Sequence, residues 1–262
     1  MGLRINTNTD AFNAYRNLSV TQGQMSKSLE KLSSGFRINR AADDAAGLAI
    51  SEGLRSQVGG LKVAVRNAQD GVSVVQTAEG ALTEVHSMLQ RMNDLSVQYN
   101  NGTQNTDSQA ALQAEFDQLQ EEVTRIADNT KFNGVALFDG ADLAFQVGYD
   151  NADTITVTGA DALAAVDTSA AVITDSTTVQ TAITAISTQR ASLGAFQNRF
   201  EHTINSVNVA IENLSASESR IRDTDMASEM VAFTRANILQ QAGTAMLAQA
   251  NQAPQSVLSL LR

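Results

Sequence analysis

The segment from Leu54 to Leu89 reads LRSQVGGLKVAVRNAQDGVSVVQTAEGALTEVHSML and carries apolar residues at alternating spacings of three and four. That spacing is typical of a coiled-coil seam, and only Glu79 and His86 interrupt it. The apolar members are Leu54, Val58, Leu61, Val65, Ala68, Val72, Val75, Leu82 and Leu89. A helix from about Asp43 to Tyr99 would be roughly 85 Å long at about 1.5 Å per residue, which predicts a rod.

Other segments show the same period on both sides of this one. A first seam comprises Ala11, Tyr15, Leu18, Met25, Leu29, Leu32 and Phe36, with Gln22 as its one polar member. After a turn at residues 100–103, Thr106 or Asp107 is expected to cap a third helix that folds back antiparallel. Its seam is Leu112, Phe116, Leu119, Val123 and Ile126. The period returns at Phe200, Ile204, Val207, Ile211, Leu214 and Ile221, and the acidic cluster at 223–225 is expected to cap a final helix that begins near Met226.

The period changes from 3.5 to 2 near Lys131. Residues 135–138 precede Asp139-Gly140, which predicts a two-residue hairpin turn. Alternating apolar residues from Leu143 to Tyr149 and the β-branched stretch 154–158 predict further strands. Residues 159–178 are rich in Ala, Thr and Asp and predict a loop or the start of a helix. The expected fold is therefore mainly α: a long antiparallel helical rod or coiled-coil bundle with a small β-hairpin region at about 131–158.

The segment from Ala236 to Leu261 contains no charged residue. Its many Gln and Asn side chains would need hydrogen-bond partners that lipid cannot supply, so it is not expected to cross a membrane. We expect Pro254 to break the helix near its end. A solvent-facing helix normally carries charge, so this surface is best explained by packing against other protein, including other chains.

Composition limits the classes of partner that the chain is expected to bind. The chain has 262 residues and a net charge of −10, which argues against nucleic acid and anionic membranes as partners. It has no cysteine, which excludes disulfides and thiolate chemistry. Its first residues contain no apolar core of a secretory signal peptide, so we expect no cleaved signal.

Residues that could support catalysis are scarce. The histidines are His86, on a seam position, and His202, and the chain carries none of the common nucleotide, zinc or serine-hydrolase motifs. Four aspartates lie in the predicted hairpin region, but their spacing misses the calcium-loop pattern. These are Asp139, Asp142, Asp150 and Asp153. We therefore expect no enzyme activity, no cofactor and no metal site.

The stretch LSSGFRINRAADDAAGLAI at residues 32–50 closely resembles the signature of bacterial flagellin. Shorter matches follow in the family's order along the chain: RINTN at 4–8, QRMNDLSVQ at 90–98, FNG at 132–134, SRIRDTDMA at 219–227, and residues 242–261. The resemblance implies a structural subunit that self-assembles into the flagellar filament for motility. Because few residues separate the hairpin region from the returning helix, the chain resembles a short form that lacks the variable outer domains.

The family pattern also implies an organisation and partners. Residues 1–42 and 222–262 would form an inner domain of terminal helices lining the filament core, and residues 43–221 a rod-shaped outer domain. The expected partners are other copies of the chain, the flagellar cap and hook–filament junction proteins, an export chaperone and the type III flagellar export apparatus. The expected location is extracellular, in the filament, after export without a cleavable signal peptide.

The resemblance assigns candidate residues as well. Arg37, Asn39, Asp43 and Asp44 are expected to make intersubunit or interdomain polar contacts, with a solvated turn as the alternative. Apolar contacts between subunits or domains are expected at Leu29, Leu32, Ile238, Leu247 and Leu258. In the family, residues matching Gln90, Arg91, Leu95 and Glu115 form protofilament contacts and a patch that a vertebrate Toll-like receptor recognises; Asn93, Tyr99 and Asn100 depart from the family pattern.

Three other interpretations compete. A hook–filament junction protein shares the terminal helices but is expected to match residues 34–50 less well. An enzymatic flagellin needs a variable insert with a zinc motif, and the chain has neither. An intracellular coiled-coil scaffold would not form helical tubes, so failure of seeded filaments to elongate would favour it.

Overall fold

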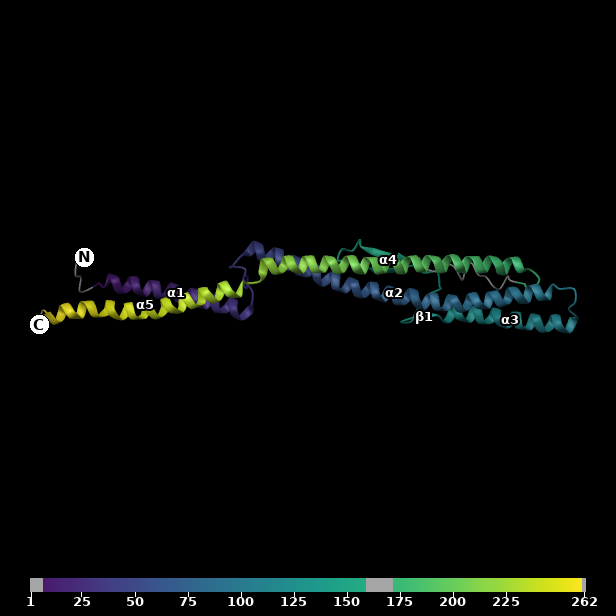
Figure 1. Ribbon diagram of the computed structural model, residues 1–262, viewed down its shortest axis with the longest axis horizontal. Helices are drawn as coiled ribbons and strands as arrows, with labels where there is room; N and C mark the ends of the chain where they lie inside the picture. The colour runs from purple at the N-terminus through teal and green to yellow at the C-terminus, as the bar shows by residue number, and fades with distance from the viewer. Residues whose placement is uncertain (1–6, 159–171, 261–262) are drawn as a thin grey trace. The chain divides into compact units, whose positions relative to one another are not determined.

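The computed structural model describes residues 7–158 and 172–260, with side chains as far as residue 252. Within these ranges it contains five helices and two β-hairpins, so the predicted mainly helical fold with a small hairpin region is confirmed (Figure 1). The helices are α1 (Thr9–Ser34), α2 (Ala45–Tyr99), α3 (Thr106–Asn129), α4 (Ser176–Arg222) and α5 (Met226–Leu260). The strands are β1 (Lys131–Phe132), β2 (Val135–Ala136), β3 (Leu143–Gln146) and β4 (Thr154–Val157).

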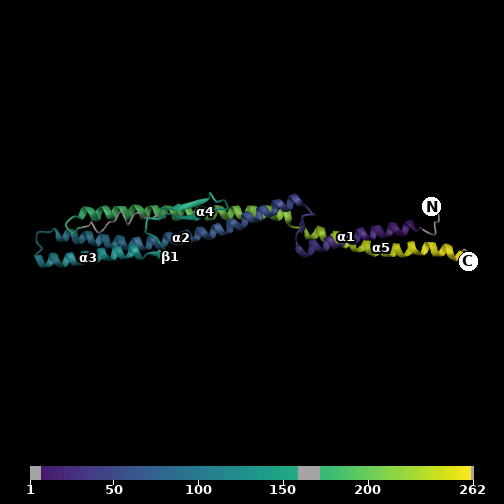
Figure 2. The ribbon, with the colours of Figure 1, turned by 180° about the vertical axis from the view of Figure 1, so that it is seen from behind.

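The chain divides into two compact units. Unit 1 comprises Met1–Ser56 and Leu214–Arg262, and unit 2 comprises Gln57–Asn213. In unit 1, α1 and α5 lie side by side (Figure 1, Figure 2). They run antiparallel, because Asn8 Nδ2 donates to the Ala250 carbonyl at 2.8 Å near one end and Lys31 pairs with Glu229 at 3.9 Å near the other.

The face of α1 that packs on α5 agrees with the predicted seam at Ala11, Leu18, Met25 and Leu32, which are half-buried, and differs from it at the alternate positions. Tyr15 and Leu29 are mainly exposed, at 64% and 56%, and Gln22 is exposed too. The residues one position earlier are the covered ones, namely Ala14, Thr21 and Ser28. Small side chains let two helices approach closely, so these residues face α5 at the positions where the sequence had predicted the bulkier Tyr15 and Leu29. A Cβ added to Gly243 of α5 would lie 3.3 Å from Leu18 Cδ1, which shows how close that approach is.

The same shift of register occurs on α2 in unit 2. Six predicted seam residues are buried and confirm the prediction at their positions, namely Val58, Leu61, Ala68, Val75, Leu82 and Leu89. At the other positions the covered residues are Ala64, Gly71, Ala78 and Val85, each one residue before a predicted seam position. Glu79 and His86 therefore do not interrupt the buried stripe of α2, because both residues lie beside that stripe. Gly71 is needed there, since an added Cβ would meet the Phe200 ring at 2.7 Å.

In unit 2, α2 lies between α3 and α4 in both views (Figure 1, Figure 2). The predicted seam of α3 and the start of that of α4 are confirmed, because Phe116, Val123 and Phe200 are buried in one apolar core with residues of α2 and the hairpins. The later seam residues of α4, from Val207 to Ile221, are half-buried and lie outside this core. The rings of Phe145 on β3 and Phe200 on α4 pack edge to face, with centroids 5.5 Å apart. This contact fixes the second hairpin on the helices.

The hairpin turn predicted at Asp139-Gly140 is wrong. The first hairpin pairs β1 with β2, and its turn is Asn133-Gly134, with φ of 50° and 83°. A two-residue turn with both φ values positive matches the twist of its strands and favours Asn-Gly. The second hairpin pairs β3 with β4 from Leu143↔Val157 to Gln146↔Thr154. Residues 159–171, within the predicted loop, lie outside the described residues.

The helix ends follow local hydrogen bonds. Asp225 Oδ1 accepts from the Ala227 and Ser228 amides, so the predicted start of the last helix at Met226 is confirmed. The cap of α3 is Asn105, whose side chain accepts from the Ser108 amide at 2.8 Å, and not Thr106 or Asp107. The break expected at Pro254 is also wrong, because α5 continues to Leu260. Proline removes only one backbone donor, which an otherwise continuous helix tolerates at a cost of about 3 kcal/mol.

Candidate interaction surfaces

Two connecting segments of unit 1 pair with each other. We define the joint as residues 35–44, between α1 and α2, together with residues 221–225, which comprise the end of α4 and its link to α5. The Arg37 amide donates to the Arg222 carbonyl at 2.6 Å, and the Thr224 amide donates to the Gly35 carbonyl at 3.0 Å. These bonds form an antiparallel bridge between Phe36 and Asp223. Gly35 allows the turn because its φ is 76°, a left-handed value that ends α1.

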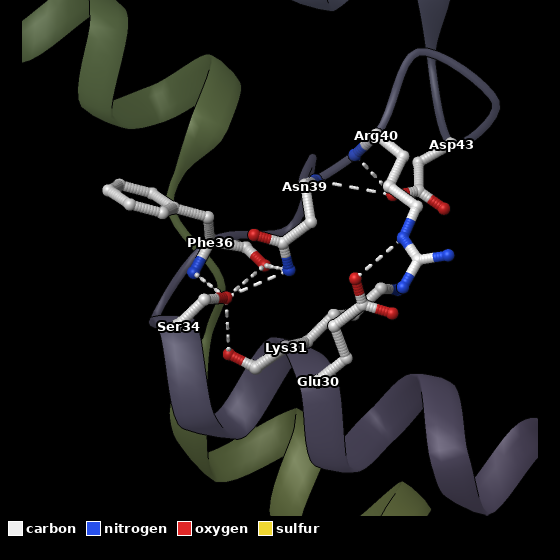
Figure 3. Close-up of polar contacts among 7 residues, drawn as sticks. All are labelled: Glu30, Lys31, Ser34, Phe36, Asn39, Arg40 and Asp43. Carbon is white, nitrogen blue, oxygen red and sulfur yellow. Dashed lines mark hydrogen bonds and ion pairs between the residues drawn. The ribbon is translucent and has the colours of Figure 1, made fainter.

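Side chains close the loop of the joint (Figure 3). Asp43 Oδ2 accepts from the amides of Asn39 at 3.2 Å and Arg40 at 3.0 Å. These bonds stabilise the carboxylate and lower the pKa of Asp43 below its ordinary value of 3.8, with the Arg40 amide as the larger cause. Asn39 Nδ2 donates to Ser34 Oγ at 2.8 Å, and Arg40 Nε donates to Glu30 Oε1 at 2.9 Å. The loop is therefore tied back to the end of α1.

Two arginines connect this loop to the helices. Arg37 Nη2 donates to the Ile221 carbonyl at 2.7 Å and lies 3.8 Å from Asp44 Oδ2. Asp44 also accepts from the Gly47 amide at 2.8 Å, which caps the start of α2. The four predicted polar residues, Arg37, Asn39, Asp43 and Asp44, thus lie together in one loop and bond to their own chain.

Arg222 was missed as a site residue, although it lies within a stretch that carried the resemblance. Its Nη1 donates to Glu52 Oε1 at 2.8 Å, and its guanidinium lies over the Phe36 ring. The arginine side chain is only 14% exposed. Its long-range contacts depend on the fold, so no local pattern around it could have predicted them.

The outward faces of α1 and α5 are rich in large apolar side chains. Among the predicted contact residues, Leu29 and Ile238 are 56% and 62% exposed, whereas Leu32 and Leu247 are half-buried. Leu258 lies outside the described side chains. Other exposed members of these two faces are Phe12, Tyr15, Val20, Met230, Val231, Leu239 and Met246. So many exposed apolar residues on two helices indicate a surface that another protein covers.

Part of the α5 face is a groove of about 500 Å³. One wall is a row of residues four apart along the helix, Met230, Thr234 and Ile238, and the other is the neighbouring row, Val231, Arg235 and Leu239. Rows four residues apart form the ridges and grooves through which helices pack on one another. The groove is therefore shaped to receive a ridge of another helix.

Unit 2 carries a second candidate surface. Arg91 on α2 and Glu115 on α3 form a two-point ion pair at 2.8 and 3.1 Å, and this pairing raises the pKa of Arg91 above its ordinary value. Gln90, one position earlier, is exposed and bonds to the His86 ring at 3.0 Å. The prediction that Leu95 belongs to this surface is wrong, because its side chain is fully buried in the core of unit 2. A leucine on a half-polar helix takes the buried face.

The described residues contain no group of three or more histidine, aspartate or glutamate side chains placed to bind a metal ion. Within the same ranges, no helix has a stretch long and apolar enough to cross a bilayer.

Comparison with known proteins gives one consistent result. Residues 5–143 match the family model for the bacterial flagellin N-terminal helical region, and residues 176–261 match the model for the C-terminal helical region. The chain is 55% identical to a flagellin of Halalkalibacterium halodurans, across 98% of this chain and 99% of that protein. It is 47% identical to a flagellin of Bacillus subtilis, across 99% and 100% of the two.

Two further similarities extend this result. A flagellar filament 33 kDa core protein of Treponema phagedenis is 47% identical, across 98% of this chain and 99% of that protein. The crystal structure of Bacillus cereus flagellin matches with a TM-score of 0.50 at 31% identity, across 58% of this chain and 94% of that one.

Proposed function

This chain belongs to the bacterial flagellin family and is a structural subunit of the flagellar filament, and on that premise we propose that the outward faces of α1 and α5 are buried between copies. It is a short flagellin, since only residues 158–175 separate β4 from α4. The relatives named above are flagellins and a filament core protein, which favours the filament over the hook–filament junction.

One observation carries the proposal: α1 and α5 leave many large apolar residues exposed, although others, such as Leu18, pack between the two helices. Ile238, for example, is 62% exposed in a stretch of α5 that has no charged residue. Fully burying such a side chain contributes about 1.5–3 kcal/mol. Several of these on each copy suffice to hold neighbouring subunits together and to offset the entropy lost on association.

The assembly we propose is helical. The outward face of one copy meets a different face of the next, and contacts of this heterologous kind build an open filament rather than a closed ring. We propose that residues 1–42 and 222–262 form the inner domain and residues 43–221 the outer one. Unit 1, which combines both ends of the chain, supports this organisation. Its limits, Ser56 and Leu214, lie 14 and 8 residues beyond the proposed ones at 42 and 222.

The finer assignments rest on the flagellin resemblance. They comprise contacts with cap, junction and chaperone proteins, export through the type III apparatus, and an extracellular filament. They also include a role of Gln90, Arg91 and Glu115 in protofilament contacts and receptor recognition. The exposure of Gln90 and Arg91 supports that role, because both side chains are accessible to a partner.

Seeded elongation tests the buried faces. Ile238→Asp places a carboxylate on the α5 groove, and we expect elongation from wild-type filament fragments to fall at least about tenfold, because burying a charged side chain in place of an apolar one is costly. Val172→Asp is the matched control: Val172 is 53% exposed, lies in unit 2 and is expected to tolerate the change. Elongation of Ile238→Asp at the rate of the control would refute the proposal.

A further inference from the structure

Three of the methionines lie along one row of α5 that we call the ridge; because an α-helix turns once in about 3.6 residues, this row winds around the helix, and Met226 and Met246 lie on nearly opposite sides of it. Met226, Met230 and Met246 belong to one row of residues four apart, which also contains Thr234, Ile238 and Ala242. The three thioether side chains are 47%, 51% and 62% exposed. Met230 forms part of the wall of the apolar groove.

The other described methionines are less accessible. Met92 is fully buried in the core of unit 2, and Met25 and Met88 are half-buried. A dissolved oxidant reaches exposed sulfur atoms first, so in the free subunit the α5 ridge is the preferred target among these residues. The chain has no cysteine to compete for the oxidant.

We propose that Met226, Met230 and Met246 are a modification site for peroxide-class oxidants, and that their oxidation prevents a free subunit from joining the filament. The thioether sulfur attacks one peroxide oxygen, the O–O bond breaks and an S=O bond forms. The sulfur loses two electrons to the peroxide, whose second oxygen leaves as water. This inference rests on the proposed function, because the ridge matters for assembly only if another copy covers it.

The effect on assembly follows from the chemistry of the product. A sulfoxide is polar and accepts hydrogen bonds, whereas the walls of the groove include Val231, Ile238 and Leu239. On the free subunit the new oxygen faces water, so the fold of α5 is unaffected. In the filament the oxygen on Met230 would replace an apolar contact in the groove, where only Thr234 and Arg235 among the lining residues could donate to it, and this opposes association.

Assembly also changes the reactivity of the site. Once neighbouring copies cover both sides of α5 along the ridge, an oxidant in solution can no longer reach the three sulfur atoms. The site therefore responds to oxidants before incorporation and is protected afterwards. Intact filaments keep their thioethers while oxidised free subunits are left out.

The experiment uses the full chain and dilute hydrogen peroxide. Peptide mass spectrometry locates the sulfoxides, circular dichroism reports the helices, and elongation is measured from untreated filament fragments. We expect Met226, Met230 and Met246 to be oxidised before Met92, helical content to stay unchanged, and elongation to fall at least about tenfold. Methionine sulfoxide reductases should restore elongation of the same sample.

The matched control replaces the three methionines by leucine, which keeps the apolar volume and removes the reactive sulfur. This variant should elongate equally well before and after peroxide. If peroxide inhibits it as strongly as wild type, the relevant site lies elsewhere and the inference fails. If the variant does not elongate at all, the reductase treatment of oxidised wild type tests the inference instead. Recovery of elongation supports it, because the reductases reverse only methionine sulfoxides, and no recovery overturns it.

Two outcomes separate this inference from the proposed function. If preformed filaments protect the three methionines but oxidised subunits still elongate normally, the modification has no effect on assembly and only this inference is overturned. If the three methionines in filaments oxidise as fast as those in free subunits, no copy covers the ridge. That result contradicts the proposed function as well.

Discussion

The guanidinium of Arg222, at the end of α4, lies 4.7 Å from the centre of the Phe36 ring, in the loop that follows α1. The same residue accepts the Arg37 amide through its carbonyl and pairs with Glu52 on α2. Arg222 therefore joins three segments of unit 1 that are far apart in sequence. Its position fixes where α5 begins relative to α1, and these two helices carry the surfaces we propose for assembly.

Replacing Arg222 by glutamine should loosen the joint. The change removes the cation–π contact and the ion pair, which together contribute about 1–2 kcal/mol. We expect hydrogen exchange at the Arg37 and Thr224 amides to accelerate by about tenfold, since those amides form the bridge of the joint. The control is Arg220→Gln, because Arg220 is exposed and, among the described residues, donates to Ser217 one turn earlier on the same helix. Equal exchange in both variants would show that Arg222 does not hold the joint.

The joint should also depend on pH through Asp43. Its folded pKa is lowered, so it contributes stability that is present above the unfolded value and is lost as the pH falls through the folded one. Protection of the Asn39 and Arg40 amides should therefore decrease below about pH 3.8, the ordinary value for this group. Hydrogen exchange, corrected for its intrinsic pH dependence, measures this effect. In Asp43→Asn the same protection should not vary across that range, and a variant that keeps the wild-type profile would assign the effect to another group.

Leu95 and Val97 of α2 allow the effects of truncating a buried and an exposed side chain on stability to be compared. Leu95→Ala should lower the free energy of unfolding by about 2–5 kcal/mol, because a fully buried leucine leaves a cavity. Val97→Ala, two residues away and 63% exposed, should change it by no more than about 0.5 kcal/mol. Urea unfolding of unit 2, followed by circular dichroism, compares the two. Similar losses in both variants would contradict the assignment of Leu95 to the core.

The ion pair between Arg91 and Glu115 should matter more for contacts with partners than for stability. Both side chains are about half exposed, so removing the pair by Arg91→Ala should cost no more than about 1 kcal/mol of folding stability. If this surface joins protofilaments, seeded elongation of that variant should fall by much more than its stability predicts. Restoring the pair in reverse, with Arg91→Glu and Glu115→Arg, should recover stability but not elongation. Wild-type elongation of the single variant would remove this surface from the assembly.

The sequence predicted the helices better than the faces that they bury. Period and capping residues placed α2 and the start of α5 correctly, because both depend on neighbours along the chain. On α1 and α2 every second buried position was predicted one residue too far along the chain, for example at His86 instead of Val85. Apolar size favours Tyr15 and Leu29 for a seam, but the helices pack through Ala14 and Ser28.

The remaining errors have a similar cause. Asp139-Gly140 and Asn133-Gly134 are both good turn sequences, and only the pairing of Phe132 with Val135 selects the second. The network around Arg222 depends on contacts between residues as far apart in sequence as Glu52. The loop residues Arg37, Asn39, Asp43 and Asp44 could be identified as a group through the family resemblance, but their bonds became known only from the fold.

If α5 needs other copies of the chain, deletion of residues 237–262 should prevent assembly without unfolding the monomer. The truncated chain keeps unit 2 and the joint, so we expect a folded monomer with intact hydrogen exchange protection in unit 2. Elongation from wild-type filament fragments, followed by electron microscopy, should be abolished. Native filaments grown from the truncated chain would contradict the account.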